Sequence, residues 1–285
     1  MNAGLQRDWD FVPGKWKPFR ISQRYYELRY AEARPPVQRI KEVTARPLWA
    51  TYFIYSPDGT LKSHHRFTLS RLRDENFAVF IICATPSPDQ IPEELHRYGD
   101  AIYWKGMSGY DFSAYTLAME SLCEHSPGAD LLLMNDSVYG PFRPLRHDVD
   151  TARWRVTGYT ATCVDDNHIQ SYAVIFRNLD DALLEALRPV MPCDKAFSSC
   201  QAVVKHQEVG MARAAARSVP VGAYWYADGS GVADPCLQAP FDLLSGGHPF
   251  MKRSLLGRMQ VFQNVERTRQ TLAGYGHPLP EPAAA

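Results

Sequence analysis

The stretch ADLLLMND, residues 129–136, decides the fold class of this chain. Its apolar residues follow one another with almost no alternation, which is typical of a parallel strand covered on both faces. Toward the N-terminus, similar β-rich runs at residues 48–55, 77–85 and 101–104 are separated by helical segments. The first half of the chain therefore predicts the order β-α-β-α-β-α-β, with 129–136 as the fourth strand.

The second half of the chain has a less regular pattern. Strands are expected at residues 154–163, 170–177 and 219–226, and helices at 179–190 and 195–217. The predicted fold class is α/β: a Rossmann-type, mostly parallel sheet flanked by helices, in a single domain with an irregular C-terminal half.

The pattern divides the chain into an extension, a domain and a tail. Residues 1–46 mix aromatic and basic side chains without a sustained period, so we expect an N-terminal extension that wraps the domain or contacts a partner. The domain is expected at 47–260, with halves at 47–150 and 151–260. Residues 261–285 form a predicted tail, and its glycine- and proline-containing end is expected to be disordered.

The composition and the sequence pattern disfavour several classes of function and site. The 31 basic and 31 acidic residues balance, which disfavours a role in binding nucleic acid or anionic lipid. The six cysteines are dispersed without zinc-ligand spacing, and we expect them to be reduced. No signal peptide or apolar run of membrane-spanning length is evident, so a cytoplasmic protein is expected.

Asn135-Asp136-Ser137 follows the fourth predicted strand directly. Ligands gather at the carboxyl ends of the strands in an open parallel sheet. A divalent cation such as Mg²⁺ or Mn²⁺ takes oxygen ligands from one or two carboxylates and from substrate phosphates, and Asp136 offers one carboxylate. The alternative is that Asp136 and Ser137 only cap the turn that follows.

A glycine turn at Gly109 leads into a predicted helix that carries Asp111 and Ser113. The free N–H groups of a helix start can hold a phosphate, whereas Asp111 suits a ribose hydroxyl, a sugar hydroxyl or a metal-bound water better. The alternative is an ordinary helix start in which the dipole favours an acidic residue.

Two segments of the second half offer a general base. The loop with Asp166 and His168 lies between two predicted strands and can also be a simple polar hairpin turn. Glu208 is a lone carboxylate in a mostly apolar and basic stretch, where it can act as a base or lie on a solvated face.

A later Gly-Gly-His-Pro turn contains His248 and is followed by Lys252. These two side chains can face a diphosphate, or they can belong to an ordinary basic surface loop.

In their order along the chain, these segments resemble the rhamnan synthesis protein F family of bacterial polysaccharide glycosyltransferases. The resemblance spans residues 48–256, and 135–141 is its most specific part. It is carried by residues 109–115 and 131–142, by Trp154, Gly158 and Thr160, by residues 168–172, and by Glu208, Pro235 and residues 249–252.

The resemblance implies a GT-A-like fold in which 47–150 binds the nucleotide sugar and 151–260 binds the acceptor. It implies the transfer of a sugar, with dTDP-rhamnose favoured over UDP- and GDP-sugars, to a glycan or lipid-linked glycan of an O-antigen, capsule or rhamnan. The working hypothesis for the reaction is an inverting displacement. The protein would then work at the inner face of the plasma membrane, in peripheral contact with it or with partner enzymes. GT-A enzymes generally hold a divalent cation through Asp-x-Asp, and here only Asp136 of that motif is acidic.

The predicted roles follow from these segments and the resemblance together. Glu208 is the first choice for the base, with Asp166 as the competing residue and His168 beside it. A catalytically inactive module that binds glycan or partner enzymes is the alternative function. The donor site is expected to comprise Tyr55, Gly109, Asp111, Ser113, Asn135, Asp136, Ser137, His248 and Lys252, with Asp136 as the residue for Mg²⁺ or Mn²⁺.

Overall fold

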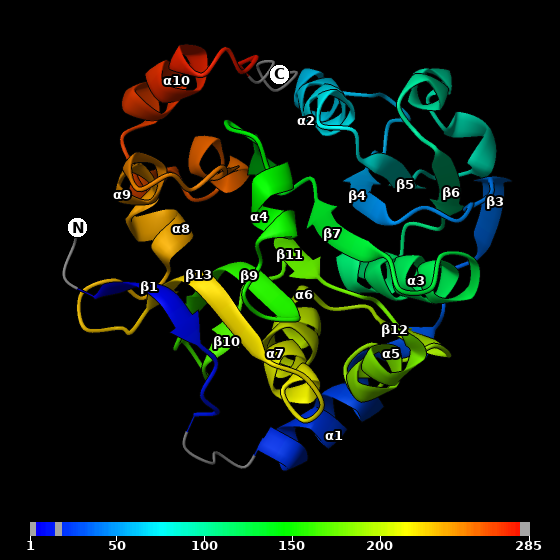
Figure 1. Cartoon of the computed structure of the whole chain (residues 1–285), viewed down its shortest axis with the longest axis horizontal. Helices are drawn as coiled ribbons and strands as arrows, with labels where there is room; N and C mark the ends of the chain where they lie inside the picture. Colours follow the sequence, from blue (N-terminus) through cyan, green and yellow to red (C-terminus); the bar gives the residue numbers. More distant parts are fainter. Residues whose placement is uncertain (1–3, 15–18, 280–285) are drawn as a thin grey trace.

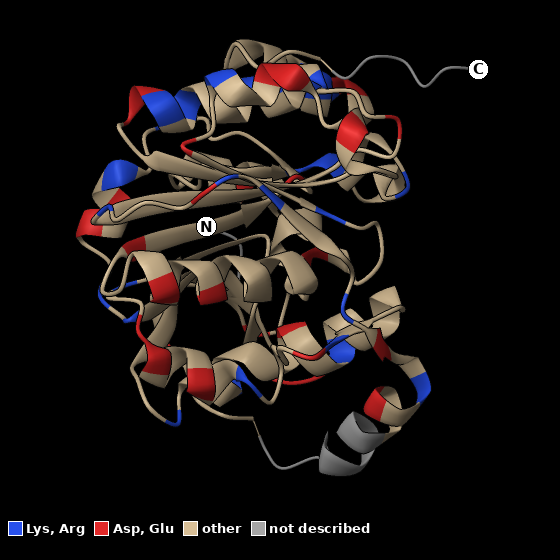
Figure 2. Cartoon of the chain, turned by 90° about the vertical axis from the view of Figure 1, so that its right-hand side faces the viewer, with Lys and Arg blue, Asp and Glu red and all other residues tan. Residues whose placement is uncertain are grey.

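A computed structural model describes residues 4–14 and 19–279, with the backbone alone for 19–24. Helices lie on both sides of one large sheet, which Figure 2 shows edge-on. No helix within these described ranges is both long and apolar enough to cross a membrane. Parts of the predicted extension and tail lie outside the described residues, namely 1–3, 15–18 and 280–285.

Ten strands of the described residues form this mixed sheet (Figure 1). In spatial order they are β1 (Leu5–Asp10), β13 (Val221–Ala227), β9 (Val156–Thr162), β11 (Ala173–Phe176), β7 (Asp130–Asn135), β4 (Leu48–Tyr55), β5 (Ala78–Ala84), β6 (Ala101–Lys105) and β3 (Val37–Lys41), with β10 (His168–Ile169) paired to β9.

Strand direction confirms the predicted fold class. β7, β4, β5 and β6 are parallel to one another, and β13 is parallel to β9. β11 lies antiparallel between β7 and β9, and the edge strands β1 and β3 are also antiparallel to their neighbours. The molecule therefore has an α/β fold with a large mixed sheet, parallel at its centre and flanked by helices.

The side chains of β4 show how the sheet is covered on both faces. Trp49 and Phe53 belong to one apolar core, whereas Tyr52 and Ile54 belong to the other. Fully burying one such side chain stabilises the fold by roughly 1.5–3 kcal/mol. The first core is covered by α3 (Tyr110–His125), α5 (Asp181–Leu187), α6 (Cys200–Ala202), the π-helix η3 (Val203–Glu208) and α7 (Val209–Ala215).

The second core is covered by a different group of helices. Leu69, Val149 and Leu243 are among their buried side chains. These helices are α2 (Ser63–Asp74), α4 (Arg146–Asp150), α8 (Pro235–Gln238) and α9 (Pro240–Ser245). By contrast, α1 (Phe19–Tyr30) packs Tyr26 and Tyr30 against the first core, and α10 (Val265–Gly274) contributes Leu272 to a smaller third cluster. The short 3-10 helices are η1 (Pro88–Gln90), η2 (Glu93–Arg97), η4 (Arg253–Leu256) and η5 (Gln260–Phe262).

Two small sheets connect distant parts of the chain. β12 (Lys195–Phe197) pairs with β2 (Ala31–Ala33), so the predicted helix at 195–217 begins only at Cys200. β14 (Met251–Lys252) pairs with β8 (Val138–Tyr139), which directly follows the Asn135-Asp136-Ser137 turn.

The described parts of both ends of the chain form regular elements of the fold. β1 and β3 come from the segment before residue 47 and are the two edge strands of the main sheet. Helix α10 lies in the predicted tail. The expectation of disorder covers residues 274–285 and is wrong for 274–279, where the His277 side chain is buried against Phe67, Tyr139 and Phe142. Aromatic contacts made across the fold order this part, although its own composition is typical of disorder.

Candidate functional site

A pocket of about 770 Å³ opens at the carboxyl ends of β4 and β7, and we call it the strand-end pocket. The loop from β6 into α3 and the residues just before β11 form further walls. This is the edge of a parallel sheet at which ligands generally bind. Eight of the predicted residues line it: Tyr55, Gly109, Asp111, Asn135, Asp136, Ser137, Glu208 and Lys252.

Asn135 connects the end of β7 to the start of α3. Its amide nitrogen Nδ2 donates to Asp111 Oδ2 at 2.7 Å. Its carbonyl oxygen Oδ1 accepts from the backbone N–H and the hydroxyl of Ser137, at 3.0 and 2.6 Å. Asn135 therefore fixes the Asp111 carboxyl and the turn after β7 relative to each other.

Asp111 lies in the first turn of α3 on the wall of the pocket. Burial and the nearby negative charge of Glu208 raise the pKa of this carboxyl to about 6. Raised carboxyl pKa values are characteristic of functional sites as well as of crowded acidic pairs. At neutral pH most molecules carry Asp111 ionised, so it accepts hydrogen bonds from hydroxyl groups.

The start of α3 has an unusual backbone. Gly109 has φ +80°, and a Cβ there would lie 2.7 Å from Ala196 Cβ and 2.9 Å from Ser113 Cβ. Tyr110 also has a positive φ, 49°, although it is not a glycine. Such a residue is conformationally strained, and strain of this kind clusters at binding sites. The result is a Tyr110 side chain on the pocket wall that is 43% exposed.

Glu208 is the last residue of the π-helix η3, and its side chain lines the strand-end pocket. Its Oε2 accepts from the backbone N–H of Ser171 at 2.9 Å and from the Ser171 hydroxyl. Its Oε1 lies 4.0 Å from Nε2 of the buried His168. Two donors thus hold the carboxylate in one orientation, and π-helical turns are frequent at functional sites.

Two cationic side chains line the pocket. Lys252 Nζ lies 3.4 Å from Ser137 Oγ and 4.6 Å from the centre of the Tyr172 ring. Arg258 is exposed in the turn after η4. The pairing of β14 with β8 holds Lys252 beside the Asn135-Asp136-Ser137 turn.

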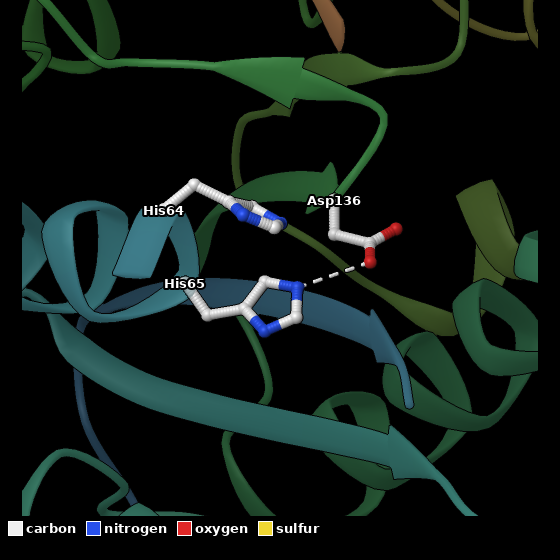
Figure 3. Close-up of side chains that lie close together, drawn as sticks. All are labelled: His64, His65 and Asp136. Carbon is white, nitrogen blue, oxygen red and sulfur yellow. Dashed lines mark hydrogen bonds and ion pairs between the residues drawn. The ribbon is translucent and has the colours of Figure 1, made fainter. Parts of the chain in front are cut away.

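Asp136 is held from several sides. Its Oδ2 accepts from His65 Nε2 at 3.2 Å and from the Tyr55 backbone N–H at 3.4 Å. Arg253 NH1 lies 3.2 Å from the same oxygen. His64 and His65 of α2 lie beside the carboxylate, and Figure 3 shows the three side chains with the His65 contact dashed.

Four predicted residues do not line the pocket. Asp166 is paired with Arg213, so its competing role as base has no support from its surroundings. Ser113 is buried below Gly109 and donates to the Tyr110 carbonyl. His168 is buried next to Glu208, with its Nε2 4.0 Å from Glu208 Oε1. His248 bonds the Tyr172 hydroxyl at 3.2 Å, and burial lowers its pKa to about 3, so it is neutral and adds no charge for a diphosphate.

Several residues of the pocket were given no role by the sequence analysis. Ser171 and Tyr172 belong to the segment 168–172 of the resemblance, and the pairing of β11 with β7 places them at the pocket. His65 is one of a histidine pair at the start of the first predicted helix, and that pair was the available signal. Arg253 follows Lys252 after the Gly-Gly-His-Pro turn, whose cations the sequence analysis considered for a diphosphate, whereas no pattern distinguished Arg258.

A larger cavity elsewhere offers less chemistry. It measures about 940 Å³ and is lined by Arg34, Glu120 and Arg188 among others. The Glu120 carboxylate bridges the two arginines at 2.6 and 2.7 Å. Because these charges are already paired, the strand-end pocket is the stronger candidate site.

No family model and no curated protein matches the chain. Part of the fold is similar to solved structures. TarS 1–349 from S. aureus is 12% identical, with a TM-score of 0.38, and the match covers 64% of this chain but only 60% of that one. The inositol-1-phosphate CTP transferase from T. maritima is 11% identical over 70% of this chain and 96% of that chain, with a TM-score of 0.40. The 4-diphosphocytidyl-2C-methyl-D-erythritolsynthase from Anaerococcus prevotii is 13% identical over 70% and 94%, with a TM-score of 0.37.

Proposed function

We propose that the chain is a nucleotide-sugar-dependent glycosyltransferase whose donor binds in the strand-end pocket. The observation that carries the proposal is that one pocket holds an oriented carboxylate, Glu208, together with the cations Lys252 and Arg258. Sugar transfer needs a base for the acceptor hydroxyl and positive charge for the departing diphosphate. The pocket supplies both.

In the proposed reaction, an acceptor hydroxyl attacks the anomeric carbon of the donor sugar. The acceptor oxygen forms a bond to that carbon, and the bond from the carbon to the diphosphate oxygen breaks. The hydroxyl proton passes to the Glu208 carboxylate, and the electron pair leaves with the nucleoside diphosphate. Ser171 holds Oε2, so Oε1 is the oxygen assigned to the proton. Attack from the face opposite the leaving group inverts the configuration.

The donor end of the pocket has aromatic and hydrogen-bonding walls. Tyr55 and Tyr110 are 48% and 43% exposed and line the pocket. Flat aromatic faces of this kind bind a nucleobase or sugar ring by stacking. Asp111, oriented by Asn135, is assigned to a ribose or sugar hydroxyl. Glu208 and Lys252 then remain for the reacting end of the donor.

The sugar and the pathway are proposed from the family resemblance. Rhamnose carried by dTDP is the first donor to test, followed by UDP- and GDP-sugars. The acceptor is a glycan or lipid-linked glycan of a bacterial O-antigen, capsule or rhamnan, reached at the inner face of the plasma membrane. Five of the segments that carry the resemblance contribute to the strand-end pocket, namely 109–115, 131–142, 168–172, Glu208 and 249–252.

One observation favours a second candidate, a binding module without catalysis. The single acidic residue of the Asn135-Asp136-Ser137 motif is already paired with Arg253. Such a module would bind glycan or partner enzymes and would have no use for a nucleotide.

Thermal unfolding with nucleoside diphosphates separates the two candidates. A ligand that binds only the native state at a concentration of 100 times its dissociation constant stabilises it by roughly 2.7 kcal/mol. The transferase is expected to unfold at a higher temperature with dTDP, UDP or GDP and to show a smaller shift with the corresponding nucleosides, which lack the diphosphate. An absence of any shift with all three diphosphates would contradict the proposed function and favour the module.

A further inference from the structure

The group formed by His64, His65 and Asp136 is where a divalent cation would have to bind if Asp136 were its ligand. One ligand atom from each of these residues lies within 4.8 Å of the others (Figure 3). Proximity alone does not make a metal site, because each ligand atom must also have a free lone pair. The hydrogen bonds of the three residues show which lone pairs are free.

His65 uses both of its ring nitrogens. The backbone N–H of Lys62 donates to His65 Nδ1 at 3.2 Å, so Nδ1 is an acceptor and carries no proton. The ring proton therefore lies on Nε2, which donates it to Asp136 Oδ2 at 3.2 Å. A protonated nitrogen cannot ligate a metal, so His65 is not available.

One oxygen of Asp136, Oδ2, is occupied by contacts with His65, the Tyr55 backbone N–H and Arg253, and a cation at the other oxygen would lie near the Arg253 charge. The Arg253 guanidinium contacts the Asp136 carboxylate at 3.2 Å and donates to the Asp136 backbone carbonyl. A guanidinium is charged at every relevant pH and repels a second cation. The remaining member, His64, is buried with Nε2 unpartnered. One imidazole does not suit Mg²⁺ or Mn²⁺, which prefer several oxygens, so these residues do not fit such a cation.

Lys252 and Arg258 are the cations of the pocket that remain available. Lys252 contacts the Ser137 hydroxyl and the Tyr172 ring, and within residues 4–14 and 19–279 it has no carboxylate partner. The Arg258 side chain has no hydrogen bond or ion pair within the same ranges, and it lines the pocket. Both can therefore give charge-assisted hydrogen bonds to phosphate oxygens.

We propose that the strand-end pocket binds the diphosphate of the donor through Lys252 and Arg258 without a divalent cation, and that Asp136 positions Arg253 and α2 instead of holding a metal. This inference rests on the proposed function, because it names the groups that bind the leaving diphosphate. It assigns to two side chains the charge that Mg²⁺ or Mn²⁺ would otherwise supply.

Calorimetric titration of dTDP, UDP and GDP into the full chain tests the proposal, once with EDTA and once with Mn²⁺. The affinity of whichever nucleotide binds is expected to change by less than about twofold, whereas a bridging cation would raise it by roughly tenfold or more. Binding that requires Mn²⁺ would overturn this inference and leave the proposed function standing. An absence of binding under both conditions would overturn the two together.

Variants at the two cations give an independent result. Lys252→Gln and Arg258→Gln are each expected to weaken nucleoside diphosphate binding by roughly tenfold or more while leaving nucleoside binding nearly unchanged, because a charge-assisted hydrogen bond to phosphate is lost. Arg269→Gln, at an exposed arginine of α10, is the charge-matched control and should change neither. Unaltered diphosphate binding by both pocket variants, with their unfolding midpoints preserved, would overturn the assignment.

Discussion

Three carboxylates line the strand-end pocket, and each has a different environment. Glu208 accepts from the Ser171 backbone and hydroxyl, Asp111 is partly exposed and has a raised pKa, and Asp136 is paired with His65 and Arg253. Carboxylates that lie in different environments differ in pKa and in hydrogen bonding, and they therefore suit different roles. In this pocket they favour Glu208 as base, Asp111 as hydroxyl acceptor and Asp136 as an anchor.

Asp111 makes the stability of the protein depend on pH. The folded protein keeps a proton on this carboxyl up to a pKa of about 6, whereas the ordinary value is 3.8. The associated stability is complete below pH ~4 and is lost as the pH rises through about 6. Asp111→Asn removes this dependence, so from pH 4 to 7 the variant should gain roughly 1–3 kcal/mol relative to the wild type. Urea unfolding across this range measures the difference, and a constant difference would contradict the raised pKa.

The anchoring role of Asp136 predicts a stability defect. Asp136→Asn removes the charge that matches Arg253 and weakens the contact with the buried His65, at a cost of about 1–3 kcal/mol in the free energy of unfolding. Asp74→Asn, at an exposed residue of α2, is the matched control and should be nearly neutral. Urea unfolding compares them; equal stability of the two variants would show that Asp136 anchors nothing.

Among the elements, those buried on both faces could be predicted and those at the edges could not. β4, β5 and β7 have nearly unbroken apolar sequences because they are covered on both sides. β1 and β3 are mostly exposed, so their side chains show no period that marks a strand. The π-helix η3 was also not predictable. A π-helix differs from an α-helix in which backbone carbonyl each N–H group bonds to, and the spacing of apolar side chains does not determine this choice. That turn nonetheless presents Glu208 to the pocket.

The start of α3 depends on Gly109. Gly109→Ala would place a Cβ against Ala196 and Ser113 at a positive φ, which is expected to destabilise the protein by roughly 1–3 kcal/mol and to weaken nucleotide binding through Tyr110 and Asp111. Gly274→Ala is the control, since a Cβ there meets nothing within 4 Å. Unfolding by urea and calorimetric titration measure the two effects. Equal behaviour of the variants would show that Gly109 has no special role.

At the scale of the whole molecule, the pocket is completed by residues far apart in the sequence. Arg253 reaches Asp136 across 117 positions, and β14 pairs with β8. Local patterns placed Asn135, Asp111 and Glu208 at candidate sites, but they carried no information about such long-range pairs. The metal prediction at Asp136 rests on its position at the end of β7 and on the family resemblance, and neither carries information about the His65 and Arg253 contacts of its carboxylate.

The C-terminal helix α10 packs against the β8–β14 pair that helps to complete the pocket. Leu272 of α10 is fully buried with Tyr139 and Met251, which belong to β8 and β14. Leu272→Ala is expected to lower the free energy of unfolding by about 2–5 kcal/mol, and the exposed Gln270→Ala should have little effect. Thermal unfolding measures both. A stable Leu272→Ala protein would mean that α10 contributes nothing to the fold.

The release of nucleoside diphosphate from a panel of dTDP-, UDP- and GDP-sugars tests the proposed transferase most directly. The wild-type chain should release the diphosphate of at least one donor, slowly with water and faster with an acceptor glycan. Glu208→Gln should reduce acceptor-dependent release by roughly 10²–10⁴-fold, whereas Glu93→Gln, at an exposed residue, should not. Release from no donor by the wild-type protein, or equal rates for Glu208→Gln and wild type, would contradict the proposed function and its base.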